Sequence, residues 1–176
     1  SFWRDKFITN KNVLIPRPDS EHLVEQTLKL IKKKQAKKIL DVGVGSGCLS
    51  LSILKERPFC KCDAIDTSKN ALKLAKINAN LHQLSDRIKF YKRDVDNFYN
   101  DKYDLIISNP PYIIRHKIKY LGSINYEPKI ALDGGLDGLE IIKKVISKSK
   151  YLLKTNGKLI LEIGYDQKYK VIESLK

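Results

Sequence analysis

The stretch Ile39-Leu-Asp-Val-Gly-Val-Gly-Ser-Gly-Cys-Leu-Ser50 decides the fold of this chain. An apolar, strand-like run leads into Gly43, Gly45 and Gly47, and a helical pattern follows. Glycines are needed where the backbone turns sharply and a ligand lies against it without a Cβ in the way. The stretch therefore predicts a strand, a tight turn and a helix that bind a nucleotide-type cofactor, although a glycine turn can also be purely structural.

The residues around the glycines distinguish between cofactors. A dinucleotide-binding fingerprint requires its third glycine at position 48, where this chain has Cys48. Asp41, directly before the turn, can accept hydrogen bonds from a cationic amine. S-adenosylmethionine carries such an amine and a pyrophosphate cofactor does not. The loop therefore favours S-adenosylmethionine over NAD.

Two further acidic residues follow the next two expected strands. Asp66 stands where a carboxylate reaches both ribose hydroxyls of a nucleotide from the neighbouring strand tip. Asp94, followed by Val95, stands where a carboxylate and a backbone N–H can contact the amine and ring nitrogen of adenine. Each acid alone also fits a helix cap or a surface position. Three acids at successive strand tips favour a cofactor site at one edge of the sheet.

Outward from the glycine stretch, short β-rich runs alternate with helical patterns, which is typical of a mostly parallel sheet covered by helices on both faces. We expect strands at residues 38–42, 61–66, 88–93, 104–108 and 158–163, and helices at residues 46–56, 68–81 and 139–153. The predicted class is α/β with a doubly wound sheet. A length of 176 residues, 42% of them hydrophobic, suits one domain.

The two ends of the chain add less regular elements. We expect a short β-hairpin from residues 2–9 and 13–15, because Asn10, Lys11 and Asn12 suit its turn. A helix over residues 20–33 follows the prolines that stop the second strand. We therefore expect residues 1–18 to form a hairpin and linker segment and residues 19–176 to form the main domain. Its last element is a helix over residues 166–176.

The fourth expected strand ends in Asn109-Pro110-Pro111-Tyr112. The prolines fix φ and remove two N–H donors, so the Asn109 side chain and the Pro110 carbonyl are presented as acceptors at the strand tip. Two acceptors can hold the two hydrogens of a planar NH2 group and turn its nitrogen towards an electrophilic methyl group, while Tyr112 forms a wall. Neither a general base nor a metal is then required. The alternative is a proline-capped strand end.

The charge of the chain leaves two interpretations open. Lysine and arginine number 34 against 20 acidic residues, a net charge of +14, which is typical of proteins with anionic partners. Lysine dominates this excess, whereas recognition of phosphates and bases favours arginine. A lysine bias in composition explains the charge as well, so nucleic acid is a possible partner that we do not favour.

The sequence also bears on location. No apolar run approaches the roughly 20 residues that cross a bilayer, and the first residues lack a secretion signal, so we expect a cytoplasmic protein without a membrane partner. Cys48, Cys60 and Cys62 are expected to be reduced thiols. The chain contains no methionine, which predicts a fragment or a trimmed sequence.

Several segments together resemble the class I S-adenosylmethionine-dependent methyltransferases that act on amide or exocyclic amine nitrogen, and in particular the release-factor glutamine methyltransferases of the HemK/PrmC type. The glycine loop and Asn109 to Tyr112 are shared with other amine methyltransferases. Three segments are more specific: Leu14-Ile-Pro-Arg-Pro-Asp-Ser-Glu21, Glu127-Pro-Lys-Ile-Ala-Leu-Asp-Gly-Gly-Leu-Asp-Gly-Leu139, and Glu162-Ile-Gly with Gln167.

The resemblance implies a Rossmann-like catalytic domain that methylates the side-chain amide of glutamine in the Gly-Gly-Gln loop of peptide-chain release factors. Asn109, Pro110 and Pro111 would bind this amide and Tyr112 would pack against it, while Arg17 and Glu127 would shape the pocket. The family's N-terminal helical domain and its last, antiparallel strand pair are expected to be absent from the chain. An adenine methyltransferase acting on RNA or DNA, and a cofactor-binding fragment without activity, remain alternatives.

Overall fold

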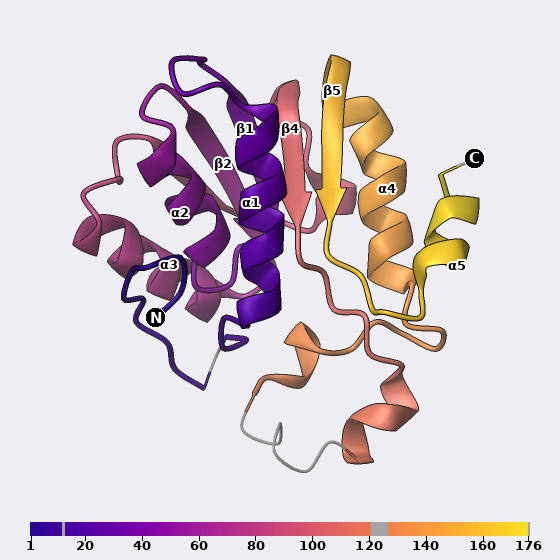
Figure 1. The fold of residues 1–176 in the computed structure, drawn as a ribbon. Helices are drawn as coiled ribbons and strands as arrows, with labels where there is room; N and C mark the ends of the chain where they lie inside the picture. Colours follow the sequence, from indigo (N-terminus) through magenta and orange to yellow (C-terminus); the bar gives the residue numbers. More distant parts are fainter. Residues whose placement is uncertain (12, 121–126, 176) are drawn as a thin grey trace.

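A computed structural model describes residues 1–11, 13–120 and 127–175 of the chain. Five parallel strands form one sheet in the order β3-β2-β1-β4-β5 (Figure 1). The predicted α/β class and its mostly parallel sheet are therefore confirmed. The strands are β1 (Lys38–Val42), β2 (Lys61–Asp66), β3 (Ile88–Lys92), β4 (Tyr103–Ser108) and β5 (Leu153–Leu161).

Helices cover both faces of this sheet (Figure 1). Successive strand residues point to opposite faces, so Ile39 packs with the helices of one face while Leu40 packs with those of the other. The first face carries α1 (Glu21–Leu30), α2 (Cys48–Glu56) and α3 (Lys69–Leu81), and the second carries α4 (Glu140–Leu152), against which α5 (Lys168–Glu173) packs. Short 3-10 helices include η1 (Pro18–Ser20), η2 (Val95–Asn97), η3 (Arg115–Tyr120) and η5 (Lys129–Ala131).

The strand order positions the site. The chain runs outward from β1 to β3 on one side and then returns to place β4 on the other side of β1. In the register of β1 and β4, Val42 lies opposite Ser108. Gly43 and Asn109, the next residues of the two strands, therefore leave the sheet side by side. Ligands of open α/β sheets bind in the crevice at such a reversal, outside the carboxyl ends of the strands.

Two expectations need correction. The fifth strand begins at Leu153, five residues before the predicted start at residue 158, because the expected turn at Asn156 and Gly157 is accommodated within the strand as an irregular register against Tyr103 and Leu105. The predicted hairpin is also not seen: within residues 1–11 and 13–15, an isolated bridge between Phe2 and Asp5 takes its place. Asn12, which was expected in its turn, lies outside the described residues, as does Lys176 at the end of the last helix.

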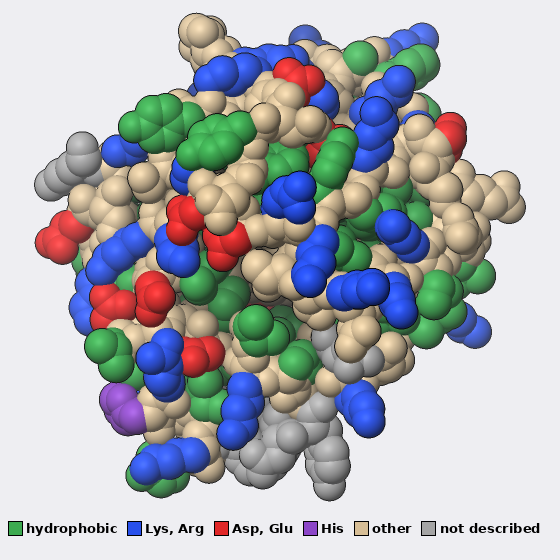
Figure 2. Space-filling model, turned by 180° about the vertical axis from the view of Figure 1, so that it is seen from behind, with side chains coloured by type: hydrophobic (Ala, Val, Ile, Leu, Met, Phe, Trp, Pro, Cys, Tyr) green, Lys and Arg blue, Asp and Glu red, His purple; other side chains and the backbone are tan. Residues whose placement is uncertain are grey.

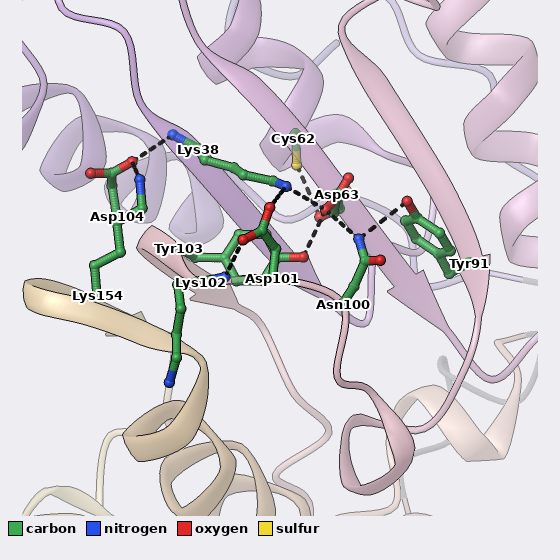
Figure 3. Close-up of polar contacts among 10 residues, drawn as sticks. All are labelled: Lys38, Cys62, Asp63, Tyr91, Asn100, Asp101, Lys102, Tyr103, Asp104 and Lys154. Carbon is green, nitrogen blue, oxygen red and sulfur yellow. Dashed lines mark hydrogen bonds and ion pairs between the residues drawn. The ribbon is translucent and has the colours of Figure 1, made fainter.

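The opposite edge of the sheet, at the amino ends of β1, β2 and β4, carries a buried polar network (Figure 3). The Asp63 carboxylate accepts from the Tyr103 hydroxyl at 2.7 Å and from the Asn100 side chain at 3.1 Å, and Lys38 Nζ lies 3.5 Å away. Asp104 accepts from the backbone N–H of Lys38 at 2.8 Å. A buried carboxylate requires such partners. The network joins the amino ends of three strands and lies away from the crevice.

Candidate active site

A cavity of about 620 Å³ lies at the carboxyl edge of the sheet. Its size is in the range of small-molecule sites. Its wall contains residues from the ends of β1, β2, β3 and β4, which are the strands whose tips the sequence singled out. Of the predicted site residues, those on the wall are Gly43, Gly45, Asp66, Asp94, Val95, Asn109, Pro111 and Arg17.

The glycine loop separates into two glycines that face the cavity and one that packs against a helix. A Cβ at Gly43 would meet no atom within 4 Å, and one at Gly45 would meet only the Gly43 carbonyl at 4.0 Å. A Cβ at Gly47 would come within 3.0 Å of the Leu51 side chain and 3.4 Å of Ala75. The first two glycines therefore keep open a space that a bound group can fill, whereas Gly47 allows close packing of α2 and α3.

The acids after β2 and β3 both line the cavity and both contact nearby backbone. Asp66 accepts from the N–H of Gly45 at 3.0 Å and from the N–H of Ser68 at 2.8 Å. Burial raises the pKa of Asp66, and these backbone donors oppose that rise. Asp94 accepts from the N–H of Asp96 at 2.9 Å and caps η2. Since a carboxylate has about four acceptor positions, each side chain keeps capacity for a ligand.

Asp41 is placed differently from the other acids. Its side chain is fully buried beneath the glycine loop, is not on the cavity wall, and neither carboxylate oxygen has a hydrogen-bond partner among the described residues. Burial raises the pKa of Asp41 to about 7. The structure therefore places Asp41 behind the cavity wall, and its contact with a cofactor amine stays a prediction.

At the tip of β4, Asn109 and Pro111 line the cavity, but Pro110 and Tyr112 do not. The Asn109 side-chain nitrogen donates to the Ser20 hydroxyl at 3.0 Å. Tyr112 is half-buried and packs against the apolar cluster that α4 and α5 share. Its backbone carbonyl accepts from Gln167 Nε2 at 3.0 Å. Pro111 and not Tyr112 is therefore on the cavity wall in this structure, and the contact of Tyr112 with a substrate stays a prediction.

Arg17 and Glu127 form an ion pair beside the cavity. The Arg17 guanidinium donates to Glu127 Oε1 at 2.6 Å, and the Glu127 side chain is only 7% exposed while that of Arg17 is 41% exposed. Only Arg17 is on the cavity wall. The pair links the segment before α1 to the segment before η5.

Three residues near this site were not predicted to take part in it. Ser20 lines the cavity and contacts Asn109, and Glu162 follows β5 beside them. Gln167 Nε2 donates to the carbonyls of Tyr112 and Gly138, and its Oε1 accepts from the N–H of Gly164. All three belong to the segments on which the family resemblance rests, and that was the only sequence signal that marked them.

Comparisons with known proteins agree with this geometry. The family model described as "Methyltransferase small domain" matches residues 20–122. A solved methyltransferase from Pyrococcus furiosus has a TM-score of 0.71 at 19% identity and covers 96% of this chain and 75% of its own. A solved ribosomal protein L11 methylase from Lactobacillus delbrueckii subsp. bulgaricus has a TM-score of 0.69 at 21% identity. The match covers 93% of this chain and 69% of the methylase. These similarities show the fold.

Among curated proteins, a release factor glutamine methyltransferase from Coxiella burnetii is 40% identical over 97% of this chain and 61% of its own length. A bifunctional methyltransferase from Rickettsia typhi is 40% identical over 98% of this chain and 37% of its own length. A release factor glutamine methyltransferase from Caulobacter vibrioides is 41% identical over 94% of this chain and 58% of its own length. The chain thus spans less than two thirds of each of these relatives.

The sheet order, the glycine loop and the cavity at the strand tips define a class I methyltransferase domain. Because the family model matches more than half of its residues, the chain belongs to the methyltransferase small domain family. No helix in the described parts of the chain is long and apolar enough to cross a membrane.

Proposed function

We propose that this chain binds S-adenosylmethionine and methylates the side-chain amide nitrogen of glutamine in the Gly-Gly-Gln loop of peptide-chain release factors. The observation that carries the proposal is the position of Asn109. It lies on the wall of the cavity at the tip of β4, next to the glycine loop. Its side-chain nitrogen donates a hydrogen bond to the Ser20 hydroxyl. The names of the relatives at about 40% identity support the substrate.

The cavity fits the proposed cofactor. Gly43 and Gly45 leave a space that a Cβ would fill, and the Asp66 and Asp94 carboxylates on the wall suit hydroxyl and amine donors. When bound, S-adenosylmethionine supplies an electrophilic methyl group whose bonding electrons stay with its sulfur. Residues of the loop and of the tips of β2 and β3 would hold it, and Asn109 would hold the substrate beside it.

The chain's own contribution to the chemistry is to orient the substrate amide. An amide nitrogen is a poor nucleophile because its lone pair is delocalised, so fixing its two hydrogens on acceptors is the useful contribution. Asn109 Oδ1 can be one acceptor, since the nitrogen of the same side chain is occupied by Ser20. The amide nitrogen gains a methyl group, and the proton that it loses passes to water.

Labelling with radioactive S-adenosylmethionine tests this function. The protein should label a release factor, and a glutamine-to-alanine change in the Gly-Gly-Gln loop of that factor should abolish the label. Ribosomal RNA, transfer RNA and DNA are assayed in parallel. Label on nucleic acid with none on the release factor would establish the adenine methyltransferase alternative instead.

The surface gives little support to that alternative. Figure 2 shows basic side chains spread over one face of the molecule, with apolar side chains between them and acidic side chains mainly on the left half. Several lysines are paired with acids, as Lys144 is with Asp96 and Lys143 is with Asp137. A nucleic-acid groove typically gathers its basic residues into a stripe or patch.

Asp66→Ala is expected to weaken binding of S-adenosylmethionine. The change removes an acceptor on the cavity wall and also the acceptor that holds the Gly45 N–H, so the loss should be roughly 1–3 kcal/mol of binding free energy. Calorimetry measures it. Asp86→Ala, at an exposed aspartate beyond α3, is the matched control and should bind as the unaltered protein does. Equal affinity in the two variants would contradict this role of Asp66.

A further inference from the structure

The Asn109 side chain lies in a small polar cluster whose other members have no assigned role. Ser20 comes from η1 and is 3% exposed, and its Oγ accepts from Asn109 Nδ2. Glu162 comes from the segment after β5, where its backbone N–H still donates to the Ser108 carbonyl at 3.0 Å. The strand ladder thus holds Glu162 beside Asn109, the residue that follows Ser108.

The Glu162 carboxylate faces the same groups as Asn109 does. Ser20, Asn109 and Tyr112 are the polar side chains that lower the pKa of this carboxyl group, and its Oε2 is buried without a hydrogen-bond partner among the described residues. A carboxylate that is ionised can only accept hydrogen bonds, so the hydroxyl of Ser20 directs its hydrogen towards Glu162. Ser20 Oγ is then left to accept from Asn109, which agrees with the contact observed.

This arrangement determines which end of the Asn109 amide faces the cavity. An asparagine side chain can rotate by 180° and exchange its oxygen with its nitrogen, and the hydrogen-bonding partners decide between the two orientations. Ser20 and Glu162 together provide acceptors on one side. Because only Nδ2 can donate to them, Oδ1 is turned away from them and remains as the acceptor for a substrate NH2 group.

We propose that Glu162 is a positioning residue that, together with Ser20, fixes the Asn109 amide with its oxygen presented to the substrate. The inference rests on the proposed function, because it assumes a substrate that donates hydrogens to Asn109. Glu162 itself is not among the residues that line the cavity. Its negative charge also strengthens Oδ1 as an acceptor, since polarisation passes along a chain of hydrogen bonds.

The proposal predicts a pH dependence. Burial raises the pKa of Glu162, and the negative charge of Asp19 acts in the same direction, while the donors Ser20, Asn109 and Tyr112 oppose it. The positive charge of Arg17, which is paired with Glu127, also faces this cluster and lowers the pKa of Tyr112, against the rise that burial causes. An acid whose pKa is raised takes up its proton at a higher pH than an exposed glutamate. Turnover should therefore fall as the pH is lowered through the pKa of Glu162.

Glu162→Gln tests the proposal in the methylation assay. Its side chain is isosteric, but its amide can donate as well as accept, so Asn109 is no longer held in one orientation. We expect kcat to fall by about tenfold or more while the Kd of S-adenosylmethionine stays within about twofold. The acidic limb of the kcat profile should disappear, because the new side chain does not titrate. The matched control is Glu173→Gln, at an exposed glutamate in α5, which should keep the unaltered profile.

A measurement without substrate separates this proposal from the proposed function. Carboxyl carbon NMR follows the titration of Glu162 in the unaltered protein and in Asn109→Ala, where the loss of a donor should raise the Glu162 pKa by about one pH unit. If the unaltered protein methylates no Gly-Gly-Gln loop, the proposed function fails, and this titration still tests the contact.

Three results would overturn the positioning role. The first is a Glu162 pKa that does not change in Asn109→Ala. The second is a kcat of Glu162→Gln equal to that of the unaltered protein. The third is a fall in kcat of Glu162→Gln that is accompanied by an equal loss of affinity for S-adenosylmethionine. If Glu162→Gln does not fold, Ser20→Ala takes its place. It removes the hydroxyl between the two side chains and should lower kcat while leaving the acidic limb in place, and a kcat equal to that of the unaltered protein would overturn the proposal.

Discussion

Asn109→Ala should reduce methyl-transfer turnover by about 100-fold or more while leaving the affinity for S-adenosylmethionine nearly unchanged. The side chain lies on the cavity wall at the tip of β4, where it can hold a substrate amide, but it is not part of the glycine loop. Its amide neither donates nor removes a proton at neutral pH, so its contribution is orientation. Single-turnover kinetics and calorimetry measure the two quantities.

The control for this change is Asn97→Ala, at an exposed asparagine in η2, which should turn over at the unaltered rate.

Asn109→Asp is the sharper variant. A carboxylate also accepts from an NH2 group, so part of the activity should remain. The new charge would face Glu162, and one of two neighbouring carboxylates then takes up a proton. The remaining activity should therefore be greatest at mildly acidic pH. Full turnover in Asn109→Ala would contradict the site.

The architecture was largely predictable because its signals are local. The predicted strands at residues 38–42 and 61–66 coincide with β1 and β2, whose central residues are buried. The errors fall where tertiary contacts override local signals. Asn156 and Gly157 have the composition of a turn, but Leu153 and Lys158 on either side of them pair with β4, so they form an irregular stretch within β5.

The residues of the candidate site likewise separate into those that the strand pattern predicted and those that depend on tertiary contacts. Gly43, Gly45 and Asp66 were placed correctly on the cavity wall because the tips of adjacent parallel strands must meet at one edge. Local patterns carry no measure of depth, so the burial of Asp41 behind the cavity wall was not predicted. Nor did local patterns bring Ser20 to Asn109, which is 89 positions away.

Gly138→Ala should be the most damaging glycine substitution for the arrangement behind the substrate site. Gly138 has a φ of +75°, and a Cβ there would come within 2.6 Å of the Tyr112 carbonyl and 2.8 Å of Gln167 Nε2. Those atoms belong to the hydrogen bond by which Gln167 holds Tyr112. The clash should cost about 1–3 kcal/mol, in addition to about 1–2 kcal/mol for the left-handed backbone.

Gly43→Ala provides a matched comparison, because Gly43 has a similar φ of +79° but an added Cβ there would meet nothing within 4 Å. The backbone penalty is common to both variants, so the difference between their free energies of unfolding in urea reports the clash at Gly138. We expect Gly138→Ala to lose the greater stability together with turnover, since Tyr112 and the residues before it are displaced. Gly43→Ala should instead lose mainly cofactor affinity, because its methyl group enters the space left for the ligand. Equal stability in the two variants would show that the contact between Gly138, Tyr112 and Gln167 does not hold this part of the site.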